Sequence, residues 1–347
     1  MRWRRKKYTE KYSENFVPEK ADCLQIDGLS VDIRYQGQDC PALEDVSFTV
    51  HSGEIVGLVG ESGCGKSLTS LAVIGLLPKA ARIQSGKILL GDKDLVSMKE
   101  QEKCLYRGSR IAMIFQDPMS ALNPLMTIGK QIEESYTIHH SNKTAEEAKE
   151  KTLEMMRKAG LSRVEELYKE YPHQLSGGMK QRAMIAMALI NHPDVIIADE
   201  PTTALDVTIQ AQILELLQEL NKEFNSMILL ISHDLGVIRS VCDRTLVMYG
   251  GRIVEEGKTE DILRNPEHPY TKGLLASVPV PENKGQDITC IPGFVEPLEK
   301  RKSTGCPFAG RCNLVQKQCT VQCPELIGTS GHYVRCLLTG GVQDVGE

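Results

Sequence analysis

Short apolar runs recur along the chain and predict the buried strands of a parallel sheet. They cover residues 55–59, 195–198 and 227–231. A helix is predicted from Leu68 to Leu77, and apolar residues at helical spacing between Ile209 and Leu220 predict another. Strands that alternate with helices indicate an α/β fold, in which ligands bind beyond the carboxyl ends of the strands.

Two further regions have a different pattern. From 21 to 53 apolar residues alternate with polar ones, which predicts antiparallel strands, and residues 88–90 extend that sheet. Between 117 and 180 charged helical stretches dominate, which predicts a helical subdomain. Residues 249–252 read as a hairpin turn between two apolar runs.

The loop after the first buried strand matches the phosphate-binding pattern G-x-x-x-x-G-K-[ST] from Gly60 to Ser67. Its glycines allow consecutive backbone N–H groups to point at phosphate oxygens. Lys66 adds a positive charge for the β- and γ-phosphates, and the Ser67 hydroxyl is a Mg²⁺ ligand. This segment predicts a nucleoside triphosphate site.

Two more motifs carry polar groups that suit the same chemistry. Leu175 to Met179 reads LSGGM, a glycine turn whose N–H groups, with the Ser176 hydroxyl, can face an anion at the start of a helix. Asp199 and Glu200 follow the second buried strand, and adjacent carboxylates there can hold Mg²⁺ and orient a water molecule. The alternative for this pair is an acidic turn after a buried strand.

With these three motifs in one chain, the sequence resembles the ATP-binding subunits of ABC transporters from about Ala21 to Pro269. The resemblance implies a P-loop NTPase of the ABC ATPase type, with a mixed sheet, an antiparallel β subdomain and a helical subdomain. It also implies that two such subunits face each other head to tail. Each ATP would then lie between the Lys66 loop of one subunit and the Ser176 turn of the other.

The resemblance also assigns roles to individual residues. It implies that Glu200 polarises the attacking water, that His233 contacts the γ-phosphate and that Lys66 neutralises charge. Mg²⁺ would be held by Ser67 and Gln116 directly and by Asp199 through water. The residues implied to bind ATP are Tyr35, Gly60, Glu61, Ser62, Gly63, Cys64, Gly65, Lys66, Ser67, Leu68, Gln116, Ser176, Gly177, Gly178, Asp199 and Asp206.

The length and the net charge of the chain limit the classes of protein to which it can belong. A chain of 347 residues with 41% hydrophobic content is long enough for two domains. The formal net charge of −5 does not show the excess of basic residues that is typical of a nucleic-acid-binding protein. No apolar run approaches the roughly 20 residues that a spanning helix needs. We therefore expect a peripheral protein on the cytoplasmic face of the membrane, with residues 1–20 as a basic, flexible tail or as a segment lying against anionic lipid.

Residues 266–347 form a proline-rich extension, which is expected to be irregular. It holds five of the chain's 11 cysteines between Cys306 and Cys336, spaced C-x5-C-x6-C-x3-C with the fifth further on. Since the N-terminus has no secretory signal, the cysteines indicate a metal or cluster site rather than disulfides. Reduced thiols without metal are the alternative, and zinc a smaller one because the C-x2-C pair is missing.

Residues 265–271 and the motif GCPFAGRC at 305–312 resemble the oligopeptide/dipeptide/nickel importer branch of the family, and Met179 resembles its D-type subunit. The branch implies a [4Fe–4S] cluster on Cys306, Cys312, Cys319 and Cys336, with Cys323 as the alternative to Cys336. The expected cofactors are ATP, Mg²⁺ and this cluster.

The expected function is ATP hydrolysis that energises an ABC importer for di- or oligopeptides. The expected partners are a second, related ATPase subunit, two transmembrane permeases and an extracytoplasmic solute-binding protein, without nucleic acid. Import of nickel, a metal chelate or another small solute is the alternative. A non-transport ABC ATPase is disfavoured because only one set of motifs occurs in the chain.

Overall fold

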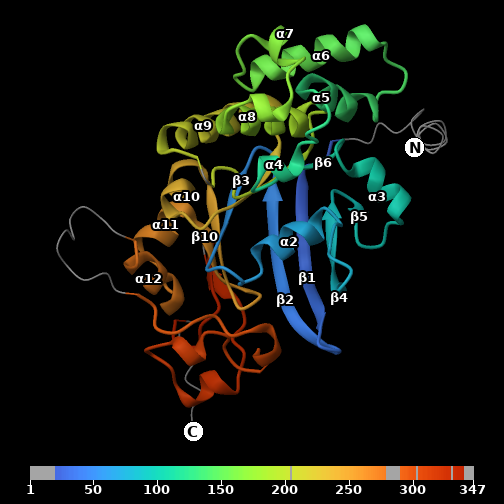
Figure 1. Cartoon of the computed structure of the whole chain (residues 1–347). Helices are drawn as coiled ribbons and strands as arrows, with labels where there is room; N and C mark the ends of the chain where they lie inside the picture. Colours follow the sequence, from blue (N-terminus) through green and yellow to red (C-terminus); the bar gives the residue numbers. More distant parts are fainter. Residues whose placement is uncertain (1–19, 204, 279–289, 302–303, 330, 340–347) are drawn as a thin grey trace. The chain divides into compact units, whose positions relative to one another are not determined.

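The computed structural model describes residues 20–203, 205–278, 290–301, 304–329 and 331–339 (Figure 1). The chain divides into two compact units. The first contains residues 1–24, 51–54 and 97–229, and the second contains residues 25–50, 55–96 and 230–347. The predicted N-terminal tail lies outside the described residues except for residue 20.

An antiparallel sheet forms one part of the second unit, in the order β2-β1-β4-β5. Its strands are β1 Cys23–Tyr35, β2 Gln38–His51, β4 Ala81–Leu90 and β5 Lys93–Asp94. Gln36 and Gly37, both with positive φ, join β1 to β2, and a two-residue connection of this kind joins only antiparallel strands. Leu29 and Val31 of β1 are fully buried, as the alternating pattern predicts, whereas Tyr35 at the end of the strand is 46% exposed.

The second unit also contains strands in the order β11-β12-β10-β9-β3. They are β3 Ile55–Val59, β9 Arg244–Tyr249, β10 Arg252–Lys258, β11 Ile327–Thr329 and β12 His332–Val334. β3 runs parallel to β9, and β9 and β10 form an antiparallel hairpin in which Arg252 pairs with Tyr249. The predicted turn at residues 249–252 is therefore confirmed.

The helix after the phosphate loop is shorter than predicted. α2 spans Lys66–Val73, whereas the sequence pattern predicts Leu68 to Leu77. Gly75 has φ of 70°, and its N–H donates to the Ala72 carbonyl, while the Leu76 N–H reaches back to the Leu71 carbonyl. These two bonds are a Schellman motif, which ends a helix at a glycine in the left-handed conformation.

The remaining helices of the second unit are short. They are α10 Leu235–Val241, α11 Thr259–Arg264, α12 Pro269–Ala276 and the 3₁₀ turns η3 Leu298–Lys300, η4 Ala309–Arg311 and η5 Lys317–Thr320. Arg335 ties the C-terminal segment to the strands, because its Nε donates to the Ile253 carbonyl and its Nη2 pairs with Asp45 at 3.2 Å. His268 is buried, and its side chain caps α12 by accepting the Tyr270 N–H.

The first unit holds β6 Ile111–Ile114 and β7 Val195–Asp199, paired in parallel, with β8 Met227–Ile231 starting next to β7. Its helices are α3 Glu100–Tyr106, α4 Pro118–Ala121, α5 Ile128–Thr137, α6 Ala145–Lys158, α7 Val164–Leu167, η1 Pro172–Gln174, α8 Gly177–Leu189 and α9 Val207–Phe224. The apolar stripe of α9 is buried at Ile213, Leu216, Leu217 and Leu220. The predicted strands and helices of this unit are therefore present.

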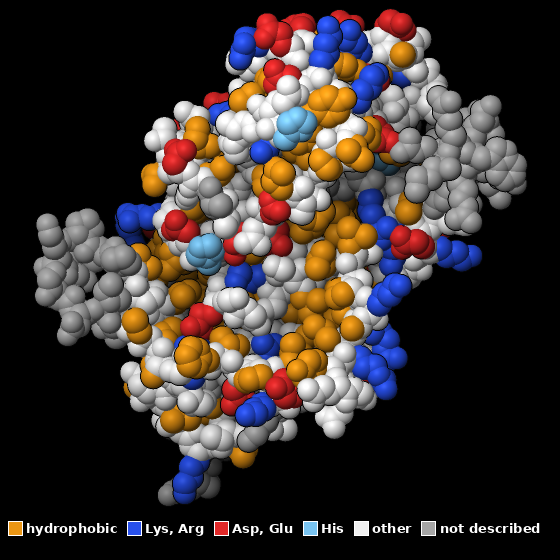
Figure 2. Space-filling view, in the orientation of Figure 1, with side chains coloured by type: hydrophobic (Ala, Val, Ile, Leu, Met, Phe, Trp, Pro, Cys, Tyr) orange, Lys and Arg blue, Asp and Glu red, His pale blue; other side chains and the backbone are white. Residues whose placement is uncertain are grey.

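Helices α5, α6 and α8 pack against one another, which confirms the helical subdomain (Figure 1). Thr144 begins α6 with a capping box, and Met155 and Met156 on its inner face are fully buried. Its outer face carries charges of both signs, which crowd over α6 and α7 at the top of Figure 2 and form exposed ion pairs such as Lys143 with Glu147. The boundaries of this subdomain at about 117–180 stay a prediction. Among the described residues no helix is long and apolar enough to cross a membrane.

A buried ion pair in the first unit gives a stability prediction. Asp194, 3% exposed, accepts hydrogen bonds from Arg110 Nε at 2.6 Å and from the Ala21 N–H at 3.2 Å. Asp194→Asn leaves the Arg110 guanidinium buried without its counter-charge, so we expect a loss of about 3–5 kcal/mol in the free energy of unfolding. Chemical denaturation of the full chain measures this loss.

The control for that experiment is Glu260→Gln, which removes an exposed pair with Arg264 (the Glu260 side chain is 65% exposed and that of Arg264 is 71% exposed). Exposed pairs contribute little because water screens them, so the unfolding midpoint should stay unchanged. Equal effects of the two substitutions would contradict the assignment of stability to the buried pair.

Candidate nucleotide-binding site

The phosphate loop, Gly60 to Ser67, connects β3 to α2 in the second unit. Gly65 has φ of 119°, and a Cβ on it would lie 2.6 Å from Leu43 Cδ2, so this position favours glycine. The Gly251 N–H donates to the Cys64 carbonyl at 2.8 Å and fixes the middle of the loop against the β9–β10 hairpin. The loop conformation therefore depends on contacts from outside the motif.

Lys66 begins α2, and its ammonium group lies over the loop. Only 6% of this residue is exposed, and its Nζ donates to the Gly60 carbonyl at 2.7 Å and to the Glu61 carbonyl at 3.0 Å. A cation beside a helix N-terminus and a glycine-rich loop suits the binding of phosphate oxygens. The Cys64 thiol lies 3.8 Å from Nζ but is fully buried, and burial raises its pKa, so it is a packing residue at neutral pH.

Tyr35 and His233, the other predicted site residues of this unit, both have exposed side chains. His233 lies two residues after the end of β8, and the next residue, Asp234, caps α10 by accepting the Gly236 N–H at 2.7 Å. This cap fixes the backbone that presents His233. The adenine and γ-phosphate roles of the two side chains stay predictions.

In the first unit the structure brings two predicted residues together that are far apart in sequence. Glu200 follows β7, and its Oε2 accepts hydrogen bonds from Gln116 Nε2 at 2.8 Å and from Thr203 Oγ1 at 3.0 Å. Its backbone has φ of 47°, which is unusual for a residue with a side chain and costs about 1–3 kcal/mol. Strain of this kind is concentrated at functional sites, where the surrounding structure holds it.

The remaining predicted residues of the first unit lie at the starts of helices, except for Asp199. Ser176 caps α8, and its hydroxyl accepts the Met179 N–H at 3.3 Å, so the glycine turn does begin a helix. Asp206 caps α9 by accepting the Ile209 N–H at 3.0 Å, whereas Ala204 lies outside the described residues. Asp199 ends β7 and is half-buried. The anion and dimer roles of these residues stay predictions.

The cysteines of the C-terminal segment are not arranged as a metal site. In the described part of the chain no group of three or more His, Cys, Asp or Glu side chains could hold a metal ion. Burial, with smaller contributions from the nearby thiols of Cys336, Cys319 and Cys312, raises the pKa of Cys306 to about 11. These four thiols are therefore neighbours without metal-ligand geometry, and the iron–sulfur cluster is not supported by their arrangement.

Three residues that sequence reasoning missed contact the phosphate loop. They are Tyr270, Arg301 and Arg311, of which the hydroxyl of Tyr270 accepts the Glu61 N–H at 2.9 Å. All three lie more than 200 residues after the loop, so no local pattern could have linked them to it. The sequence signals were the two segments that resemble the importer branch, residues 265–271, which contain Tyr270, and the motif GCPFAGRC, which contains Arg311.

A strand–loop–helix with this lysine, an acidic strand end and parallel strands defines a P-loop NTPase. Comparison with protein families refines that class. Residues 43–203 match the ABC transporter family, and residues 254–319 match the oligopeptide/dipeptide transporter C-terminal region.

Curated relatives match over nearly the whole chain. The oligopeptide transport ATP-binding protein AppD of Bacillus subtilis is 47% identical over 91% of this chain and 96% of its own length. The dipeptide transport ATP-binding protein DppD of the same species is 46% identical over 91% of this chain and 94% of its own length. This chain belongs to the family of ABC transporter ATP-binding proteins and is an ABC-type ATPase.

Solved structures support the same fold. The ATP-binding cassette MJ0796, in a dimeric post-hydrolysis state bound to ADP and Pi, is 28% identical with a TM-score of 0.62. It aligns with 68% of this chain and 98% of its own. CbiO1 from Clostridium perfringens, part of the ABC transporter complex cbiONQ, has a TM-score of 0.60 at 26% identity, over 71% of this chain and 92% of its own. The predicted α/β ABC ATPase fold is confirmed.

Proposed function

We propose that this chain hydrolyses ATP to energise an ABC importer for di- or oligopeptides. The observation that carries the proposal is the match of residues 254–319 to the oligopeptide/dipeptide transporter C-terminal region. Relatives named for oligopeptide and dipeptide transport, aligned over more than nine-tenths of both chains, support it. Nickel, a metal chelate or another small solute is the alternative cargo.

The proposed chemistry is phosphoryl transfer to water, which depends on positioning and on charge neutralisation. The loop N–H groups and Lys66 bind the β- and γ-phosphates, and Tyr35 stacks on the adenine. Mg²⁺, when bound, supplies positive charge to the phosphate oxygens, and Ser67, Gln116 and Asp199 are the residues proposed to hold it. His233 contacts the γ-phosphate.

Glu200 is proposed to polarise the attacking water. The two hydrogen bonds that it receives, from Gln116 and Thr203, support this role because they fix one carboxylate oxygen. A carboxylate whose orientation is fixed in this way can accept a proton from water in a defined direction. Since Gln116 bonds to Glu200, a movement of Gln116 would also change the orientation of that carboxylate.

The proposed assembly contains a second, related ATPase subunit, two transmembrane permeases and an extracytoplasmic solute-binding protein. In it the chain is peripheral, on the cytoplasmic face of the membrane. The turn at Ser176, Gly177 and Gly178 and the α9 cap at Asp206 serve the ATP that is bound by the partner ATPase. The helix start at Ser176 supports this role, since its first N–H groups are able to face an anion.

We further propose that Cys306, Cys312, Cys319 and Cys336 hold a [4Fe–4S] cluster. The resemblance of the spacing of these four cysteines to the importer branch is the basis of this choice, and Cys312, Cys319 and Cys336 lie near enough to Cys306 to affect its pKa. Cys323 donates from its Sγ to the Pro324 carbonyl at 3.7 Å and is the alternative to Cys336 as the fourth ligand. Ligation would require the loops between the thiols to move, because the thiols do not form a metal-binding group as they stand.

Co-purification tests the transport proposal. The tagged full chain, captured anaerobically from native membranes in mild detergent, should retain two permeases, a second ATPase and a binding protein. Mass spectrometry of the ligand on that binding protein should find peptides. A nickel chelate there would favour the alternative cargo, and recovery of soluble partners or ribosomes alone would contradict transport.

Substitution of Glu200 tests the hydrolysis proposal. Glu200→Gln keeps the size and one acceptor oxygen but removes the base, so we expect kcat for ATP hydrolysis to fall by about 10²–10⁴-fold. ATP affinity should be retained, because the loop at Lys66 is unchanged. The matched control is Glu215→Gln on the exposed face of α9, which should hydrolyse ATP at the normal rate. Normal turnover in the Glu200 variant would rule out this residue as the base.

Single cysteine substitutions test the cluster proposal. Serine at Cys306, Cys312, Cys319 or Cys336 should abolish bound iron and acid-labile sulfide in anaerobically purified protein. Serine at Cys323, or at the exposed Cys290, should leave both unchanged. If the Cys323 variant lost its iron and the Cys336 variant kept it, Cys323 rather than Cys336 would be the fourth ligand. A wild-type protein without iron and sulfide would refute the cluster.

A further inference from the structure

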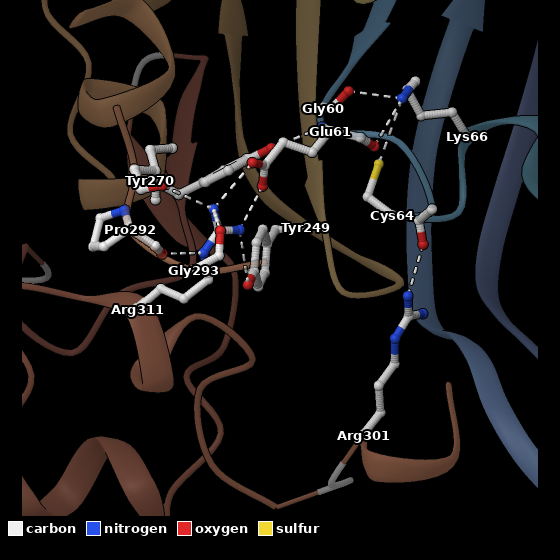
Figure 3. A network of polar contacts seen from close by, with 12 residues as sticks. Gly60, Glu61, Cys64, Lys66, Tyr249, Tyr270, Pro292, Gly293, Arg301 and Arg311 are labelled. Atoms are coloured by element: carbon white, nitrogen blue, oxygen red, sulfur yellow. Dashed lines mark hydrogen bonds and ion pairs between the residues drawn. The ribbon is translucent and has the colours of Figure 1, made fainter. Parts of the chain in front are cut away.

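A partly buried ion pair joins the phosphate loop to the C-terminal segment within the second unit. Both terminal nitrogens of Arg311 donate to the Glu61 carboxylate, Nη1 to Oε2 at 2.6 Å and Nη2 to Oε1 at 3.0 Å (Figure 3). The Arg311 side chain is 7% exposed and that of Glu61 is 31% exposed. A two-point, charge-assisted contact of this kind fixes geometry as well as charge.

The guanidinium of Arg311 is itself held rigidly. Its Nε donates to the Pro292 carbonyl at 2.8 Å, and its Nη2 also donates to the Gly293 carbonyl at 3.2 Å. One face of the guanidinium lies over the Tyr249 ring, 5.7 Å from the ring centroid (Figure 3). Because the donor is already oriented, the pair can orient Glu61 in turn.

Two more contacts from the same part of the chain reach the loop. Tyr270 Oη accepts the Glu61 N–H at 2.9 Å, and Arg301 Nη2 donates to the Gly63 carbonyl at 2.6 Å (Figure 3). Tyr270 is fully buried and packs against Tyr249 and Phe308, with ring centroids 4.7 Å and 5.4 Å apart. Residues 61–63 are therefore held from the C-terminal side by a side-chain pair and two backbone contacts.

We propose that Arg311 is a positioning residue for ATP binding. Through Glu61 it holds residues 61–63 in the conformation that presents the loop N–H groups to the phosphates, so the C-terminal segment sets the ATP affinity. The proposal uses the assignment of the loop to ATP and does not depend on the transported solute or on the cluster.

A simpler electrostatic role makes a different prediction. If Arg311 only neutralised Glu61, any positive charge at position 311 would preserve ATP affinity. Arg311→Lys separates the two roles, because lysine keeps the charge but is a single-point donor that cannot make the two parallel bonds. If Arg311 positions Glu61, ATP binding should be weak in both Arg311→Lys and Arg311→Met. If Arg311 only neutralises the charge of Glu61, ATP binding should be weak in Arg311→Met alone.

The experiment measures the Kd for ATP of the purified full chain, and KM and kcat of the detergent-purified assembly. We expect both Arg311 variants to raise Kd and KM on the order of tenfold, with kcat changed less than about twofold. Glu61→Gln should weaken binding in the same direction. Addition of Arg311→Met to Glu61→Gln should have little further effect, because both changes remove one interaction.

The matched control is Arg335→Met. Arg335 is a buried arginine of the same C-terminal segment, and it bonds to Ile253, Pro324 and Asp45 but to no residue of the loop in the contacts described. The Arg335→Met substitution should lower the midpoint of thermal unfolding while leaving the Kd for ATP unchanged. Wild-type Kd in Arg311→Lys, or an equal loss of affinity in Arg335→Met, would overturn the proposal. Failure of the wild-type chain to bind ATP would instead refute the ATP site itself.

Discussion

The conformation of the phosphate loop is the constraint on which the site depends. A glycine-rich segment has many conformations, and fixing each residue costs about 1–2 kcal/mol of backbone entropy. The loop also has to leave its N–H groups available for a ligand, so it cannot be stabilised by internal bonds alone. Gly251 and Arg301 meet this requirement by donating to loop carbonyls from distant parts of the chain, while Tyr270 accepts the N–H of Glu61.

The acidic end of β7 meets a comparable requirement by a different route. There the backbone of Glu200 is strained rather than flexible, with φ of 47°. Such strain persists only where neighbouring groups fix the residue, and the hydrogen bonds from Gln116 and Thr203 do so. In both segments the side chain or the N–H groups proposed for chemistry are oriented by residues outside the motif.

A feature could be predicted from the sequence when the residues that determine it lie close together along the chain. The buried strands and the α9 stripe depend on residues within one segment, and periodicity identified them. The position of the phosphate loop was identified by its motif, although the loop conformation also depends on residues outside that motif. The predicted end of α2 was wrong because Gly75 was overlooked. A glycine at that position is a local signal for the end of a helix. The contacts of Glu61 with Tyr270 and Arg311 could not be predicted, since they join segments more than 200 residues apart.

The phosphate-loop pattern treats Glu61 as a variable position, and the structure explains why a variable position can still be constrained. The fixed letters of the pattern, such as Gly65 and Lys66, express what a phosphate requires of the loop. Glu61 meets a second requirement, which comes from the rest of this chain: its carboxylate is the ion-pair partner of Arg311 in the C-terminal segment. In this chain Glu61 therefore links a common motif to the C-terminal segment, and its carboxylate is constrained by its bonds to Arg311.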